Sequence, residues 1–87
     1  MIDNALAEAV QFAPLIERVH GAGHPELTRV RELTMELNDS DDADRISEIF
    51  TELRSVTNNY TLPEDACEAY EATYKALEKA DALHSKA

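Results

Sequence analysis

Three histidines and a single cysteine are the side chains of this 87-residue chain best suited to metal or thiol chemistry. If the chain forms antiparallel helices, His20 and His24 fall near Cys67 at one end of the molecule. His84 then falls at the other end, separated by about 20 helical residues or roughly 30 Å. These histidines therefore cannot share one ion within a chain. His20, His24 and Cys67 could form a loosely spaced metal-binding trio, but the favoured interpretation is two solvated loop histidines beside a small core cysteine.

Acidic residues crowd the segment 39–44, which at first resembles a calcium-binding loop. The spacing lacks the central glycine and the closing glutamate of an EF-hand, so we interpret these aspartates as caps of a helix. Glu48 and Glu52 are four residues apart on one helix face, but no histidine has matching spacing and they are predicted to be solvated. No Ser/His/Asp order, phosphate-binding glycine loop or CxxC motif occurs. We therefore predict no catalytic residue and no enzyme activity.

The composition favours a small globular protein that binds neither nucleic acid nor membranes. The chain is long enough for one domain, 44% of its residues are apolar, and its net charge is −10. Such a charge is repelled by a duplex phosphate backbone and by an anionic membrane. The expected partners are basic proteins, cations or a second copy of the chain. One cysteine allows no internal disulfide, and no signal peptide or apolar run of about 20 residues is visible, so a cytoplasmic location is expected.

The elements that must position these side chains are four short helices, expected over residues 3–20, 25–38, 43–58 and 62–85 of one domain. Apolar residues recur at helical spacing in each segment. The expected inner positions are Ile2, Leu6, Ala9, Val10, Ala13, Ile16 and Val19, then Leu27, Val30, Leu33, Thr34 and Leu37, then Ile46, Ile49, Phe50, Leu53 and Val56, and finally Ala66, Tyr70, Thr73, Tyr74, Leu77 and Ala80. Short connections between helices predict an all-α, up-down-up-down antiparallel four-helix bundle.

Several residues predict where these helices bend, begin and end. Pro14 removes a backbone donor and should kink the first helix. Gly21 should end that helix in a left-handed cap. Thr61 and Glu64 have the spacing of a capping box, so Thr61 should begin the fourth helix.

Two segments resemble the RIC, or repair of iron centres, family. Residues 56–67, with Tyr70 and Tyr74, resemble the TNN-x-T-x-P-x-x-AC-x-x-Y pattern at the turn between that family's last two helices. Residues 17–21 and 24–27 are similar to the turn between its first two helices. Together the matched regions cover about 60 residues. The resemblance implies a hemerythrin-like four-helix fold and, in the family itself, a di-iron centre.

The positions expected for the iron ligands of that family depart from its pattern. Its histidines and glutamates lie at one end of the bundle, where this chain begins at Met1, turns near Asn38 and ends at Ala87. Ala43 stands where a histidine of the third helix is expected, and His84 falls nearly one turn early. Since a di-iron site needs about six inward ligands, no residue is assigned as a ligand. We predict no cofactor, with iron as the alternative.

The resulting hypothesis is a metal-free RIC-like bundle that acts through protein–protein contacts, as an accessory to iron–sulfur cluster repair or to the response to nitrosative or oxidative stress. Its shortened end should expose Ile2, Leu37, Ile46 and Leu83 and so favour a homodimer. The alternative is a metal-binding protein whose site forms at a dimer junction. That site would combine His84 and Asp81 with the acids of residues 41–44. A small-molecule pocket between the helices is a third hypothesis, on which the sequence is silent.

Overall fold

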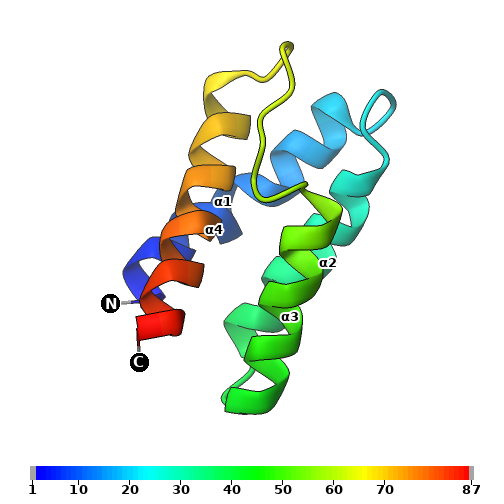
Figure 1. Ribbon diagram of the computed structural model, residues 1–87. Helices are drawn as coiled ribbons and strands as arrows, with labels where there is room; N and C mark the ends of the chain where they lie inside the picture. Colours follow the sequence, from blue (N-terminus) through cyan, green and yellow to red (C-terminus); the bar gives the residue numbers. More distant parts are fainter. Residues whose placement is uncertain (1, 87) are drawn as a thin grey trace.

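A computed structural model describes the backbone of residues 2–86 and the side chains of residues 5–85. The described chain is all-helical and contains no strand. Its helices are α1 (Ile2–His20), α2 (Glu26–Asp39), α3 (Ala43–Val56) and α4 (Glu68–Lys86). Figure 1 shows them running alternately up and down, with the two ends of the chain close together at one end of the bundle. The predicted four-helix bundle is thus confirmed.

The core consists of the helical stripes expected from the sequence. All five inner positions predicted for α2 are buried, as are Ile49, Phe50 and Leu53 of α3. On α4, Tyr70, Thr73, Tyr74, Leu77 and Ala80 are buried, whereas Ala66 lies in the preceding loop and is half-buried. Val19 differs from the prediction, because its side chain is 62% exposed. The inward face of α1 continues instead from Ile16 to His20, four residues later.

The ends of the first three helices follow local rules in part. Asp42 caps α3 as predicted, since its side chain accepts hydrogen bonds from the backbone N–H groups of Asp44 and Arg45. Helix α1 continues through Pro14 without interruption. No glycine has a positive φ, so the left-handed cap predicted at Gly21 is wrong. Gly21 is required for another reason, because an added Cβ would lie 2.3 Å from the carbonyl oxygen of Glu17.

The start of α4 is the main correction to the predicted elements. The helix begins at Glu68, six residues after the predicted Leu62. Thr61 does not cap it, because its hydroxyl donates back to the carbonyl oxygen of Asn58 at 2.6 Å. The first helical bond instead joins the N–H of Glu71 to the carbonyl of Cys67. A long loop therefore connects α3 to α4, and it crosses one end of the bundle (Figure 1).

Neighbouring helices meet along four lines of contact, here called seams. Arginine side chains form ion pairs across three of them. Within the described residues, ion pairs join Arg31 to Glu17 across α1 and α2, Arg29 to Glu52 and Arg45 to Glu36 across α2 and α3, and Arg54 to Asp81 across α3 and α4. The α1–α4 seam has no such pair among the described side chains. There the two backbones pack closely, whereas α3 and α4 are linked mainly by long side chains.

Candidate functional site

The end of α1 and the turn that follows it meet the loop before α4, first through His20 and Cys67. Nε2 of His20 lies 3.3 Å from Sγ of Cys67, within hydrogen-bonding distance for sulfur. The imidazole also stands edge-on to the ring of Tyr70, with centroids 5.2 Å apart. Cys67 is exposed, so the prediction of a small core cysteine is wrong. It lies just before the first turn of α4.

His24 makes a second link between the same two segments. Its Nε2–H donates to Oδ1 of Asp65 at 3.0 Å, and Nδ1 lies 3.4 Å from a carboxylate oxygen of Glu26. The hydrogen bond to Asp65 raises the pKa of His24 and lowers that of Asp65. His24 lies in the loop, as predicted, but its side chain is half-buried, with 21% exposure. The fold uses this histidine to attach the α3–α4 loop to the start of α2.

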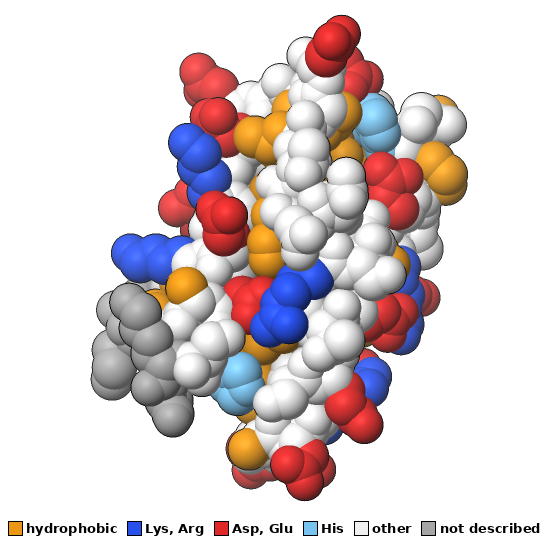
Figure 2. All heavy atoms as spheres, viewed as in Figure 1, with side chains coloured by type: hydrophobic (Ala, Val, Ile, Leu, Met, Phe, Trp, Pro, Cys, Tyr) orange, Lys and Arg blue, Asp and Glu red, His pale blue; other side chains and the backbone are white. Residues whose placement is uncertain are grey.

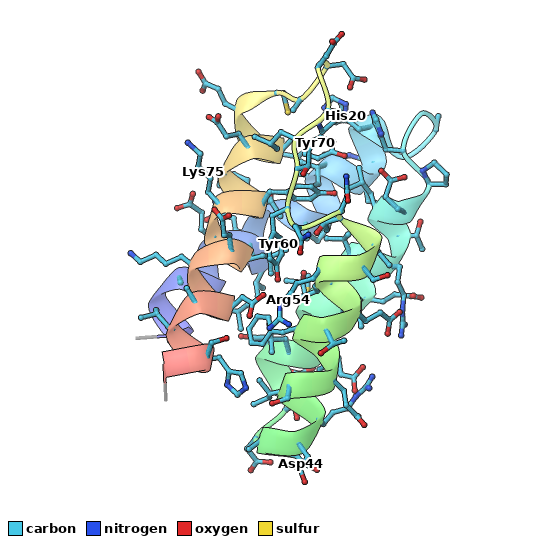
Figure 3. The ribbon with its side chains drawn as sticks, viewed as in Figure 1. His20, Asp44, Arg54, Tyr60, Tyr70 and Lys75 are labelled. Atoms are coloured by element: carbon cyan, nitrogen blue, oxygen red, sulfur yellow. The ribbon has the colours of Figure 1, made fainter. Side chains whose placement is uncertain are left out.

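Two buried tyrosines form the floor beneath these histidines. Tyr70 is fully buried and lies edge-on to Tyr74, with ring centroids 5.0 Å apart. Burial raises the pKa of both phenols, so they stay protonated at neutral pH. A small hollow of about 280 Å³ opens beside them, and its lining includes His24, Thr57 and Asn58. Figure 3 shows His20 and Tyr70 together at the end of the bundle crossed by the loop.

The α3–α4 loop contains an unusual left-handed turn that sequence reasoning missed. Asn58, Asn59 and Tyr60 have φ angles of 53°, 59° and 62°. The hydroxyl of Thr57 donates to the carbonyl of Leu53 at 2.6 Å and accepts the backbone N–H of Tyr60 at 2.9 Å. The phenol of Tyr60 donates to Asp81 at 2.8 Å. The Asn-Asn pair was the available signal, because asparagine tolerates this conformation better than most residues.

Asp81 of the alternative metal site belongs to a network across the α3–α4 seam. Its carboxylate accepts bonds from Nε and Nη2 of Arg54, both at 2.7 Å, and from the Tyr60 hydroxyl. Burial would raise the pKa of Asp81, but these donors outweigh it and hold the pKa below its usual value. Figure 3 shows Arg54 and Tyr60 reaching into the space between α3 and α4. Both oxygens are therefore engaged by protein donors.

His84 has its own partners at the other end of α4. Its Nε2 lies 3.0 Å from the hydroxyl of Ser47, and its ring lies 5.4 Å from that of Phe50. The acids predicted to join it there, within residues 41–44, are exposed at the α2–α3 turn, where Asp42 caps α3. His84, Asp81 and Asp42 of the alternative site thus each have a local structural role.

The donor arrangement does not fit an iron centre. Within the part of the chain that the structure describes, no three His, Cys, Asp or Glu side chains are placed to hold one metal ion. The His20–Cys67 and His24–Asp65 contacts are separate pairs that join two turns. We therefore derive no chemistry through a metal.

Comparisons with known proteins add no assignment. No family model, curated protein or solved structure matches the chain. Among the described residues, no helix has the length and apolar character needed to span a bilayer.

Proposed function

We propose that the protein is a metal-free, RIC-like, hemerythrin-like bundle that acts through protein–protein contacts. We place it as an accessory to iron–sulfur cluster repair or to the response to nitrosative or oxidative stress. The observation that carries the proposal is the left-handed turn at Asn58, Asn59 and Tyr60, which presents two exposed asparagines at one end of the bundle.

Such a turn is costly and therefore needs a reason. A left-handed L-residue costs roughly 1–2 kcal/mol, although asparagine costs less than most. Tyr60 holds the turn in place, because its backbone N–H donates to the Thr57 hydroxyl and its phenol donates to Asp81. Strained backbone of this kind gathers at binding and catalytic sites, where it fixes groups in advance. A held loop loses little conformational entropy on binding, so its amides are suited to recognising a protein surface.

The surroundings of the turn indicate the chemistry of the partner. The same loop carries exposed carboxylates at Glu64 and Asp65, Glu68 at the start of α4 adds a third, and the whole chain has a net charge of −10. Complementary charge accelerates association and excludes partners of like charge. We therefore propose a partner with a basic surface that also offers hydrogen-bonding groups to the amides of Asn58 and Asn59.

A homodimer is retained in the proposal, but the surface predicted for it is not. Leu37 is buried, with 4% exposure, because the inner face of α2 reaches the end of the helix. Ile46 and Leu83 are half-buried and pack against the core. Ile2 has a side chain outside the described residues. Among the described side chains, this end of the bundle therefore presents no broad apolar patch of the kind that a dimer there would need.

The experiment combines metal analysis with partner capture. Untagged protein from iron-supplemented cells is analysed for metals, then immobilised and exposed to extract from cells treated with nitric oxide. The test variant is Asn58→Gly with Asn59→Gly, which allows the same backbone and removes both amides. The matched control is Asn38→Ala, at the exposed end of α2. Because central interface residues dominate binding, the test variant should retain a specific basic partner at least about tenfold less well than the control.

Each outcome bears on a separate part of the proposal. Near two irons per chain would overturn the metal-free assignment, and one metal per two chains would favour the dimer-junction alternative. Equal capture by the test variant and the control would show that the turn is not the recognition surface. Capture of a protein outside iron–sulfur or stress metabolism would refute the assigned process.

A further inference from the structure

We infer that the groove between α1 and α4 is the surface on which a second copy of the chain docks. This inference rests on the homodimer of the proposed function and assigns its surface. The groove has a volume of about 540 Å³ and lies on the outer side of the α1–α4 seam. Its floor includes the small side chains of Ala5, Ala72 and Ala76. Small side chains permit two helices to approach closely.

The order of acidic and basic residues along the groove makes it complementary in charge to an inverted second copy of the same groove. The amino-terminal half of α4 contributes Glu68 and Glu71, and the next part contributes Lys75 and Lys79. In Figure 2, red and blue side chains interleave along the left edge of the molecule, on the outer side of α4. Figure 3 shows Lys75 projecting from α4 away from α3. Within the groove lining, the two acids of α4 precede the two lysines, so an inverted copy would bring its lysines toward these acids.

A two-fold axis between two copies would place these opposite charges against each other. If α4 packs antiparallel on the α4 of a second copy, an axis near residues 73–74 places Glu68 opposite the partner's Lys79. It also places Glu71 opposite the partner's Lys75. Each cross-pair then occurs twice, as isologous contacts require. Glu8, on the α1 wall of the groove, adds a third carboxylate beside the same lysines.

The internal ion pairs of the protein leave these groups available. Glu71 and Lys75 are 3.7 Å apart within α4, and both side chains are more than half exposed. Such exposed pairs contribute little to stability and are readily exchanged. Among the described side chains, no ion pair involves Glu8, Glu68 or Lys79. By contrast, Arg29, Arg31, Arg45 and Arg54 each pair with an acid of another helix.

The area available for the interface determines the expected affinity of the dimer. The bundle extends 33 by 20 by 18 Å, and the groove runs along one seam and so occupies only part of its long face. A standard interface buries roughly 800 Å² per partner. The dimer should therefore be weak, with a Kd in the range of about 1–100 µM, and charge pairing should determine which surfaces meet.

The test uses two charge-reversed variants of the whole chain and sedimentation from micromolar to millimolar concentration. One variant carries Lys75→Glu and Lys79→Glu, and the other carries Glu68→Lys and Glu71→Lys. Each should dimerise at least about tenfold more weakly than the wild type, because like charges then face each other. An equimolar mixture should recover a heterodimer. The control for the net charge of the lysine-reversed variant is Arg18→Glu, Asn38→Glu and Ser55→Glu, all exposed and outside the groove.

Circular dichroism checks that each variant is folded. A further variant, Ala72→Trp, fills the groove without changing its charge and should block dimerisation sterically. A wild-type chain that stays monomeric at millimolar concentration overturns the homodimer itself. A wild-type dimer that survives both reversals and the tryptophan overturns only the assigned surface. Loss of dimer in the net-charge control, or failure of the mixture to associate, also overturns the assignment. None of these results depends on the turn at residues 58–60, which the partner-capture experiment tests separately.

Discussion

The two faces of α4 are held by different forces. Toward α3, the helix is joined by a polar network in which Asp81 accepts bonds from Arg54 at 2.7 Å and from Tyr60 at 2.8 Å. Toward α1, the backbones pack closely over small side chains, and Ala9 and Ala80 are fully buried. The first seam depends on charge and hydrogen bonds across a wider space. The second depends on steric fit.

The difference separates the charged groups that support the fold from those that contribute little to it. Charged groups in the α3–α4 seam face inward and hold the loop at residues 57–67 in place. Charged groups beside the α1–α4 seam, such as Lys75, face outward and support little of the fold. Substitutions in the two seams should therefore respond differently to side-chain volume, salt and pH.

The largest effect is expected from enlarging a side chain inside the α1–α4 seam. Ala9→Leu should lower the free energy of unfolding by about 1–3 kcal/mol, because a packed seam cannot accommodate three more carbon atoms without strain. Ala72→Leu, in the open groove, is the matched control and should change it by less than about 0.5 kcal/mol. Urea unfolding measures both. Equal losses would show that the seam and the groove are not distinct.

Removing the central acid of the α3–α4 seam should have the next largest effect. Asp81→Ala leaves Arg54 and Tyr60 without their acceptor, and the expected loss is about 1–2 kcal/mol. The loss is moderate because the Arg54 side chain is 41% exposed and can regain water. Glu78→Ala, on the exposed side of the same helix, is the control. The loss of unfolding free energy caused by Asp81→Ala should be smaller in 1 M salt, whereas the loss caused by Ala9→Leu should be unchanged. A salt-independent loss would contradict the electrostatic account.

The smallest change in stability is expected from Asp65→Asn, which removes the partner of His24 at one end of the bundle. The pKa of His24 is raised above 6.5, so its contribution to stability is complete below pH 6.5 and is lost as pH rises through the folded-state value. The pKa of Asp65 is lowered from 3.8, so its contribution is complete above pH 3.8 and is lost as pH falls through the folded-state value. The stability difference between wild type and Asp65→Asn should therefore be largest between pH 3.8 and pH 6.5 and should decrease as the pH rises through the folded-state pKa of His24.

Urea unfolding at pH 3, 5 and 8 measures this difference, and Glu64→Gln in the same exposed loop serves as the control. A difference that stays constant from pH 5 to pH 8 would show that His24 is not the partner of Asp65.

Helix class and inward faces could be predicted from the sequence because both depend on local periodicity. The spacing of Leu27, Val30 and Leu33 places their side chains on one face of a helix, and that apolar face is the one that becomes buried. Asp42 could be assigned as a cap because its acceptor reaches only the next few backbone donors. The start of α4 could not be placed, because Thr61 and Glu64 satisfy a local rule that the left-handed turn before them overrides.

The sequence by itself determined the number of helices, their apolar stripes and the acidic surface, since each depends on residue type and on spacing within about four residues. Only the tertiary structure decided the long-range pairings. Arg54 and Asp81 are 27 residues apart and His20 and Cys67 are 47 apart. The sequence offers many acids for each arginine and histidine, and spacing along the chain carries no preference among them. The tilt and separation of the packed helices select the partner, because a hydrogen bond forms only where two side chains meet within about 3 Å.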